Sequence, residues 1–175
     1  MIETKCAVFN RNTEWYAVYT AFRSEKKVYS GLVKRGFEAY LPVQTLLRQW
    51  SDRRKRVDFP VIEGYVFVQC STEDFSNICA VPGVVTFLSD RSGIPLPLEA
   101  STVGALQKLI EKSEEPLVFS KECLMEGDRI EVIRGRFKGW FGELIRKKEE
   151  CRLVVRLGHW GCVTANVAVN CVRKV

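Results

Sequence analysis

The densest cluster of charge in this sequence is basic. Between residues 48 and 58, only Asp52 and Asp58 oppose five cations, which are Arg48, Arg53, Arg54, Lys55 and Arg56. Most charge runs of this kind are solvated hairpin tips. Cations at this density also neutralise the phosphates of a nearby nucleic acid strand, and Arg23, Lys26 and Lys27 would extend the same surface. Because phosphate contacts position a protein without reading bases, the run predicts backbone binding and discloses no recognition sequence.

Aromatic side chains make up a second candidate site. Tyr19, Tyr65 and Phe67 lie in two segments that alternate as neighbouring strands do. Strand aromatics usually pack inward, and this alternative is strongest for Phe67. Exposed aromatic clusters rimmed by polar groups instead mark protein interfaces. The residues alone leave both alternatives open.

Residues suited to catalysis or metal binding are scarce. His159 is the single histidine, and it lies in a glycine-flanked turn where a solvent-exposed ring is expected. The seven cysteines contain no C-x-x-C spacing, which argues against zinc. The sequence also lacks a G-x-S-x-G motif and a phosphate-cradling glycine loop. We therefore predict that the protein is not an enzyme and that it binds no metal and no cofactor.

Composition places the chain among soluble globular proteins. Its 175 residues are 46% hydrophobic and 27% charged. The net charge of +6 is concentrated after residue 122, where 11 Lys and Arg accompany 6 Asp and Glu, a weak sign of a polyanionic partner. No apolar run approaches the roughly 20 residues of a membrane helix, and no secretion signal is evident. We expect a cytoplasmic protein without a membrane partner.

The elements that position these residues alternate in type. After a polar tail, residues 15–22 read as a strand, and a helix follows from Ser24, a plausible N-cap, to Gly36. Ser71 and Asp74 match a capping box. A basic loop joins two strands that lead to a third, which favours an antiparallel sheet. The remaining expected elements are strands at residues 37–50, 57–60, 64–68 and 81–88, and a helix after Glu99 that ends near Lys112.

The C-terminal third has the pattern of a small barrel. Residues 126–146 read as a tight hairpin with sharp turns at its glycines and Phe137 as an anchor. Further strands at residues 151–157, 162–167 and 170–175 predict a closed barrel. The hairpin resembles the KOW motif, and its matching residues are Gly127, Asp128, Val132, Gly135, Phe137, Gly139 and Gly142. Taken alone, it is equally compatible with a barrel that binds nothing.

The order of the motifs resembles the NusG family of transcription elongation factors. W-Y-A-V-Y-T at residues 15–20, G-Y-V-F-V at 64–68 and V-P-G-V-V at 81–85 precede the KOW segment, as in that family. The resemblance implies an α+β fold, with an N-terminal antiparallel sheet flanked by helices (NGN-like) and then a small SH3-like β-barrel (KOW). The expected domains are a flexible tail (1–14), the NGN-like domain (15–112), a linker (113–122) and the KOW domain (123–175).

The resemblance also implies a function in transcription elongation and antitermination. Tyr19, Tyr65 and Phe67 would bind the clamp helices of RNA polymerase, the cations would contact the DNA of the elongation complex, and pausing or termination would be suppressed. The KOW domain would recruit a further partner such as a ribosomal protein. The I-E-G-Y-V-F-V segment is closer to the specialised RfaH and UpxY paralogues, whereas residues 161–167 depart from the usual KOW end. A KOW-containing RNA-binding or ribosome-associated protein is the alternative.

Overall fold

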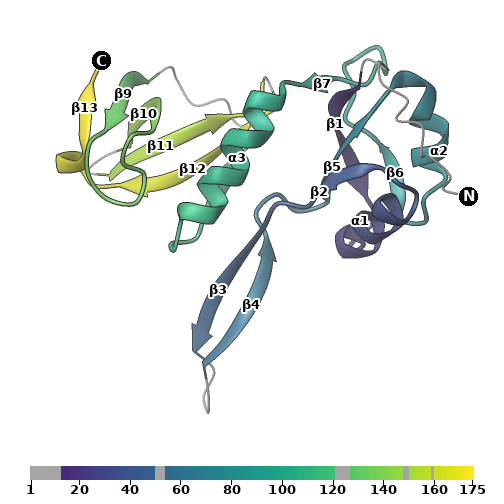
Figure 1. The fold of residues 1–175 in the computed structure, drawn as a ribbon, viewed down its shortest axis with the longest axis horizontal. Helices are drawn as coiled ribbons and strands as arrows, with labels where there is room; N and C mark the ends of the chain where they lie inside the picture. The colour runs from purple at the N-terminus through teal and green to yellow at the C-terminus, as the bar shows by residue number, and fades with distance from the viewer. Residues whose placement is uncertain (1–12, 50–53, 121–126, 148–149, 159) are drawn as a thin grey trace, which may run out of the picture. The chain divides into compact units, whose positions relative to one another are not determined.

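The computed structural model of the chain describes residues 13–49, 54–120, 127–147, 150–158 and 160–175 (Figure 1). The predicted tail, apart from its last two residues, lies outside these ranges, as do Arg53 and His159. The chain divides into two compact units, Met1–Tyr40 with Gly64–Pro97, and Leu41–Glu63 with Leu98–Val175. None of the described helices is long and apolar enough to cross a membrane.

A five-stranded sheet is the centre of the first unit, as far as the described residues show. Its order is β2 (Glu38–Tyr40), β5 (Tyr65–Cys70), β1 (Glu14–Thr20) and β6 (Val84–Phe87), and β7 (Pro97–Leu98) also pairs with β1. The pairs β2–β5, β5–β1 and β1–β6 are antiparallel, as the sequence predicted. The register places Tyr19 opposite Tyr65 and Ala17 opposite Phe67. Because directly opposite residues share a face, these side chains lie on one side of the sheet.

The other face of this sheet carries an aromatic cluster. Tyr16 of β1 makes edge-to-face contacts with Phe75, at 5.0 Å between ring centroids, and with Phe87, at 6.0 Å. Phe75 begins the short helix α2 (Phe75–Cys79), and η1 (Thr72–Asp74) precedes it. The predicted capping box is confirmed, because the Ser71 backbone N–H and hydroxyl both donate to Asp74 Oδ2, at 3.1 and 2.7 Å.

Helix α1 (Glu25–Lys34) lies close to its predicted position. It buries Val28 and Leu32, an i,i+4 pair on one helical face. Gly36 follows the helix with a φ of 86°, a conformation that glycine adopts without strain. Ser24 does occupy the N-cap position, but its hydroxyl donates to the Phe22 carbonyl at 3.4 Å and caps no helical N–H group.

The single strand predicted for residues 37–50 is wrong, because the chain divides it into β2 and β3 (Val43–Gln49). Pro42 stands between them, and proline has no N–H to donate to a sheet. Its carbonyl instead accepts the Val61 N–H at 2.7 Å. Strand β3 pairs with β4 (Arg54–Pro60) as a separate two-stranded sheet, so this hairpin does not join the five-stranded sheet as expected.

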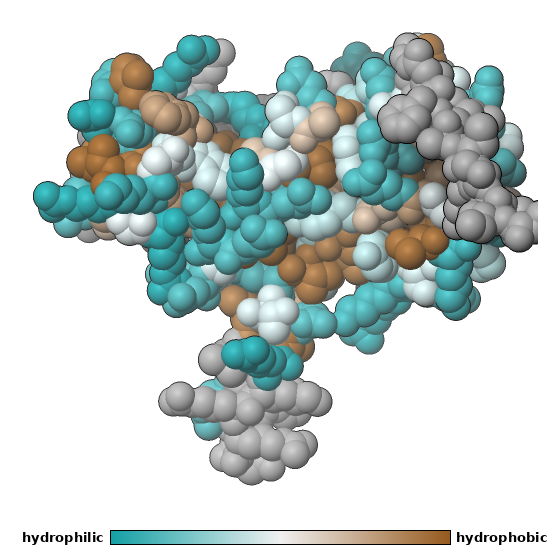
Figure 2. Space-filling view, in the orientation of Figure 1, coloured by the Kyte–Doolittle hydropathy of each residue, from teal (hydrophilic) through white to brown (hydrophobic). Residues whose placement is uncertain are grey.

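Helix α3 (Ala100–Lys112) opens the main part of the second unit and has the predicted bounds. It buries Val103, Leu106 and Leu109, whereas the side chains on its visible face are mostly hydrophilic (Figure 2). Within this unit α3 lies beside both β3 and β11.

Six strands of the described residues form the C-terminal sheet. They are β8 (Val118–Ser120), β9 (Asp128–Val132), β10 (Phe141–Lys147), β11 (Glu150–Arg156), β12 (Cys162–Val167) and β13 (Val172–Lys174). Their order is β13-β9-β10-β11-β12-β8, and no pairing in the described chain joins the two ends, so the expected closed barrel is not shown. Strand β8 falls inside the segment predicted as a linker and pairs with β12.

The turn between β9 and β10 matches the predicted glycine pattern. Gly135 and Gly139 have φ values of 83° and 80°, and the Gly139 N–H donates to the Val132 carbonyl at 2.7 Å. Phe137 is buried, with its ring edge-on to Trp140 at 6.1 Å, which confirms its role as an anchor. Gly142 is not among the glycines with a positive φ, and a Cβ there would lie 2.9 Å from Leu153 Cδ1, so a larger residue would require the Leu153 side chain to shift.

Candidate functional site

Tyr19 and Tyr65 form a cross-strand aromatic pair in the first unit. Their ring centroids are 5.2 Å apart, and the ring planes are inclined by 51°. Tyr19 exposes 44% of its surface, whereas Tyr65 exposes only 9%. Tyr19 is therefore partly exposed to solvent, and the largely buried Tyr65 ring packs against it.

Gly64 fixes the position of the Tyr19 ring. Its φ of 78° is in the region that favours glycine, and a Cβ at this position would lie 3.1 Å from Tyr19 Cε2. The Gly64 carbonyl accepts the Thr20 N–H at 2.8 Å, and its N–H donates to Glu25 Oε1 at 3.0 Å. Residues from β1, α1 and the turn before β5 thus hold the tyrosine pair in place.

Phe67 belongs to the core. It has no exposed surface, and its ring stacks on that of Tyr40 with centroids 6.2 Å apart. Core packing was the alternative that the sequence left open for this residue. Because an interface needs accessible surface, the structure separates Phe67 from Tyr19, although both side chains lie on the same face of the sheet.

Two exposed apolar residues of the first unit were not predicted from the sequence. Phe22 is 86% exposed in the turn after β1, and Val85 of β6 is 56% exposed. Val85 precedes Thr86, which pairs with Tyr19. Arg23 has a φ of 54°, and its guanidinium carbon lies 5.0 Å from the centroid of the Phe22 ring. Phe22 continues the apolar alternation of residues 15–22, so its sequence context does not indicate that its side chain is exposed.

The predicted cations belong to different units. Lys26 and Lys27 are exposed in the first turn of α1, close in sequence to Arg23, and Arg56 is exposed on β4. The hairpin register pairs the backbone of Arg48 with that of Lys55, and Gln49 with Arg54. The side chains of Arg48, Arg54 and Lys55 lie outside the described residues, as does the whole of Arg53. The backbone register therefore places Arg48, Arg54 and Lys55 at one end of the hairpin, as the sequence predicts.

A partly buried ion pair lies on the C-terminal sheet. Arg156 Nε donates to Glu143 Oε2 at 2.6 Å, and a second guanidinium nitrogen donates to Oε1. The Gly127 N–H donates to the same carboxylate. The hydrogen bond from Arg156 is the main cause that holds the pKa of Glu143 below its ordinary value. A cavity of about 600 Å³ adjoins the pair, and the exposed ring of Phe141 lines it.

Several residues of the KOW pattern are needed by the backbone of this sheet. A Cβ on Gly127 would collide with the carbonyl oxygen of Leu144, so the chain approaches β10 too closely for any other residue. Asp128 begins β9, and its Oδ1 forms an ion pair with Lys174 Nζ at 2.6 Å. Val132 is buried at the end of the same strand. These contacts account for the pattern structurally without assigning a partner to it.

The fold and these surfaces define an α+β protein whose candidate sites suit macromolecular partners. Residues 13–107, more than half of the chain, match the family described as "Transcription termination factor nusG". The chain belongs to the NusG family, whose members are transcription factors without enzymatic activity.

The chain is also similar to solved structures. The chain is similar to the structure titled "Domain interaction in Thermotoga maritima NusG", with 22% identity and a TM-score of 0.49 over 94% of this chain and 98% of that one. It is also similar to conformations A and B of the MjSpt4:Spt5 complex. Conformation A has 19% identity and a TM-score of 0.30 over 92% of this chain and 97% of that one. Conformation B has 21% identity and a TM-score of 0.32 over 92% of this chain and 96% of that one. No curated protein matches the chain significantly.

Proposed function

We propose that this protein is a transcription elongation and antitermination factor that binds RNA polymerase through a surface centred on Tyr19. Membership of the NusG family supports the general role. The observation that carries the proposal is the half-exposed Tyr19 ring, which is held against Tyr65 and Gly64. A preorganised aromatic ring with an accessible hydroxyl suits the edge of a protein interface, because it loses little freedom on binding.

The residues around Tyr19 are proposed to have two roles, which are contact with the polymerase and packing against the Tyr19 ring. Phe22 adds exposed apolar surface three residues after Tyr19 and is proposed to widen the contact with the clamp helices of the polymerase. Tyr65 retains a small accessible edge and supports the Tyr19 ring. Phe67 is buried below the surface, so we assign it to the core and leave it out of the proposed contact.

The basic hairpin β3–β4 is proposed to contact the DNA backbone of the elongation complex. Arg56 is exposed, and the register brings the backbones of Arg48, Arg54 and Lys55 to the same end of the hairpin. Their contribution would be electrostatic and sequence-independent. Arg23, Lys26 and Lys27 are proposed to contribute from the first unit.

The C-terminal sheet is proposed to be an SH3-like KOW barrel that recruits a further partner, such as a ribosomal protein. The proposed functional regions are the polymerase-binding region 15–112 and the KOW region 123–175, joined by residues 113–122, with pausing or termination suppressed while the first region is bound. The I-E-G-Y-V-F-V segment supports a place among the specialised paralogues that resemble RfaH and UpxY.

Co-purification with RNA polymerase, with and without nuclease treatment, tests the proposal. We expect binding that resists nuclease and that Tyr19→Ala weakens. Tyr29→Ala is the matched control, because Tyr29 is a comparably exposed tyrosine on α1 of the same unit. Nuclease-sensitive binding that Tyr19→Ala leaves unchanged would instead favour a KOW-containing RNA-binding or ribosome-associated protein.

A further inference from the structure

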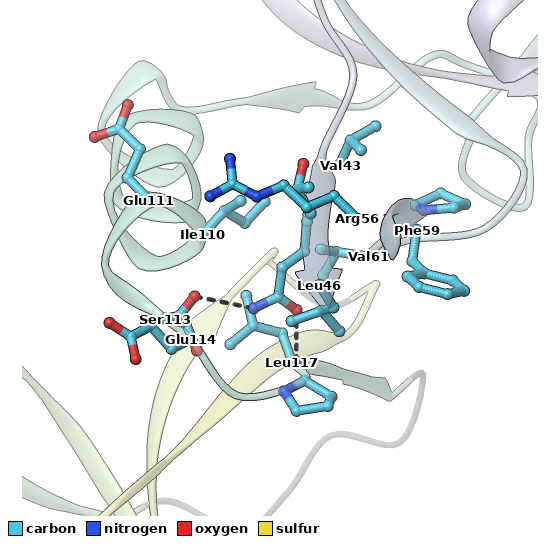
Figure 3. A pocket seen from close by; sticks show the side chains of 14 residues that line it. Val43, Leu46, Arg56, Phe59, Val61, Ile110, Glu111, Ser113, Glu114 and Leu117 are labelled. Carbon is cyan, nitrogen blue, oxygen red and sulfur yellow. Dashed lines mark hydrogen bonds between the residues drawn. The ribbon is translucent and has the colours of Figure 1, made fainter. Parts of the chain in front are cut away.

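One side chain of the hairpin holds the segment that connects α3 to the C-terminal sheet. Gln44 of β3 donates from Nε2 to the carbonyl oxygens of Ser113, at 3.1 Å, and Glu115, at 2.7 Å. Its Oε1 accepts the Leu117 N–H at 3.1 Å (Figure 3). The side-chain amide therefore bonds three backbone groups spread over five residues.

The orientation of the Gln44 amide follows from these partners. Two carbonyl oxygens require the NH₂ end, and one N–H group requires the oxygen end. A flipped amide would place oxygen against oxygen and nitrogen against nitrogen, so this orientation alone fits. Gln44 is only 4% exposed, which means that water cannot easily replace the lost partners if the side chain is removed.

The segment has few other restraints. Helix α3 ends at Lys112, and β8 begins at Val118, so residues 113–117 are all the irregular chain between them. The Ser113 N–H closes the last turn of α3 on Leu109, and the Ser113 hydroxyl donates to Glu115 at 2.9 Å. Among the described residues, a further contact is the ion pair between Glu114 and Arg136, in which both side chains are exposed, and such pairs contribute little.

The connecting segment and Gln44 border an open groove. A cavity of about 1020 Å³ lies beside the amide, between β3 and α3, with Val43 and Ile110 in its walls and Leu117 at the connecting segment (Figure 3). The three side-chain hydrogen bonds of Gln44 are therefore the directional contacts that hold the segment beside β3 at the border of this groove.

We propose that Gln44 is a latch that makes hairpin β3–β4, α3 and the C-terminal sheet move as one body. The polar segment at residues 113–122 predicted a free tether between two domains. The hydrogen bonds of Gln44 turn residues 113–117 into a fixed connection. Strand β8 follows directly and joins the C-terminal sheet by pairing with β12. The hairpin then cannot change its orientation independently of the C-terminal sheet.

Backbone amide exchange on the full chain tests the latch directly. Gln44→Met keeps the length of the side chain but removes the three side-chain hydrogen bonds to Ser113, Glu115 and Leu117. We expect the Leu117 amide to exchange about tenfold faster in this variant, because its opening no longer breaks a buried hydrogen bond. Amides of β5 and β11 should keep their rates. Thr45→Ala is the control, because it removes the neighbouring bond from Thr45 to Asp58 and leaves Gln44 in place.

Rotational diffusion provides a second measurement, which applies to the unmodified protein. Nitrogen-15 relaxation should give amides of β3, α3 and β11 one common correlation time, and Gln44→Met should make the correlation times of β3 and β11 differ. Separate tumbling of β11 in the unmodified chain, or an unchanged Leu117 exchange rate in Gln44→Met, would overturn the latch. Neither measurement needs polymerase or nucleic acid, so the result is independent of the proposed function.

Discussion

Tyr19 and Tyr65 are direct partners across β1 and β5, with ring centroids 5.2 Å apart, yet only Tyr19 is substantially exposed. Cross-strand partners share one face of a sheet, so the difference in exposure does not come from pointing in opposite directions. It reflects their neighbours, because Tyr19 lies near the end of β1 and Tyr65 directly follows Gly64. The two tyrosines should therefore respond differently to truncation.

Tyr19→Ala should weaken the proposed polymerase complex while leaving the protein stable. The loss of one aromatic anchor costs on the order of 2 kcal/mol, or a roughly thirtyfold lower affinity. The melting temperature should stay close to that of the unmodified protein, because the ring is half exposed. Affinity and melting temperature should be measured on the same sample. Unchanged affinity would remove Tyr19 from the interface.

Tyr65→Ala should mainly destabilise the first unit. The family resemblance implies that Tyr65 binds the polymerase, but a side chain that is 9% exposed leaves a cavity when it is truncated. Removing a buried aromatic ring costs about 3 kcal/mol or more. Denaturant unfolding of Tyr65→Ala beside Tyr65→Phe measures this, since phenylalanine preserves the ring. A Tyr65→Ala variant of full stability would show that the ring contributes little to the core.

Gly64→Ala should disturb both the backbone and the Tyr19 ring. A Cβ at a φ of 78° costs roughly 1–2 kcal/mol. It would also press on Tyr19 Cε2 from 3.1 Å. Gly93→Ala is the matched control, because Gly93 has a φ of 81° and open space around it. Gly64→Ala should be the less stable variant and should also bind polymerase more weakly. Equal stabilities would mean that the Tyr19 ring moves aside freely.

Replacing Arg53, Arg54 and Arg56 by Ala should weaken association with the DNA of an elongation complex. If all three cations contact phosphates, the slope of log K against log salt should fall in magnitude by about 2.7. The control removes the same charge from exposed positions elsewhere, through Lys34→Ala, Arg91→Ala and Lys108→Ala. A salt slope that is the same in both triple variants would identify the hairpin run as a solvated tip.

The local elements were largely predictable because their signals are local. The apolar spacing of α3, the glycine after α1 and the Ser71–Asp74 capping box each depend on residues within a few positions of one another. The glycine turn around Phe137 was found for the same reason. Family membership was predictable because the diagnostic motifs are short and occur in a fixed order.

Features that depend on contacts between distant segments of the chain could not be predicted from the sequence. The separate pairing of β3 with β4 depends on where Pro42 breaks the strand, and the addition of β8 depends on the edge that β12 offers. Burial of Tyr65 and exposure of Phe22 depend on neighbours from distant segments. Gln44 reads as an ordinary polar position of a hairpin, because its partners lie about 70 residues away.

The ion pair between Glu143 and Arg156 should give the C-terminal sheet a stability that depends on pH. Arg156 holds the pKa of Glu143 below its ordinary value, so the folded state binds this proton less tightly than the unfolded state does. The pair therefore stabilises the protein fully above the ordinary carboxyl pKa of about 4.3, and this contribution is lost as the pH falls through the lowered folded pKa.

Glu143→Gln tests this dependence, because glutamine keeps the shape of the side chain and cannot ionise. Denaturant unfolding at several pH values should show the largest loss of stability relative to the unmodified protein at neutral pH. The difference should shrink as acid protonates Glu143 in the unmodified chain. Glu131→Gln is the control, since its partner Arg173 is largely exposed and solvent screens that pair, so its effect should be small at every pH. A Glu143→Gln loss that stays constant from neutral pH to acid would show that the carboxylate charge does not stabilise the sheet.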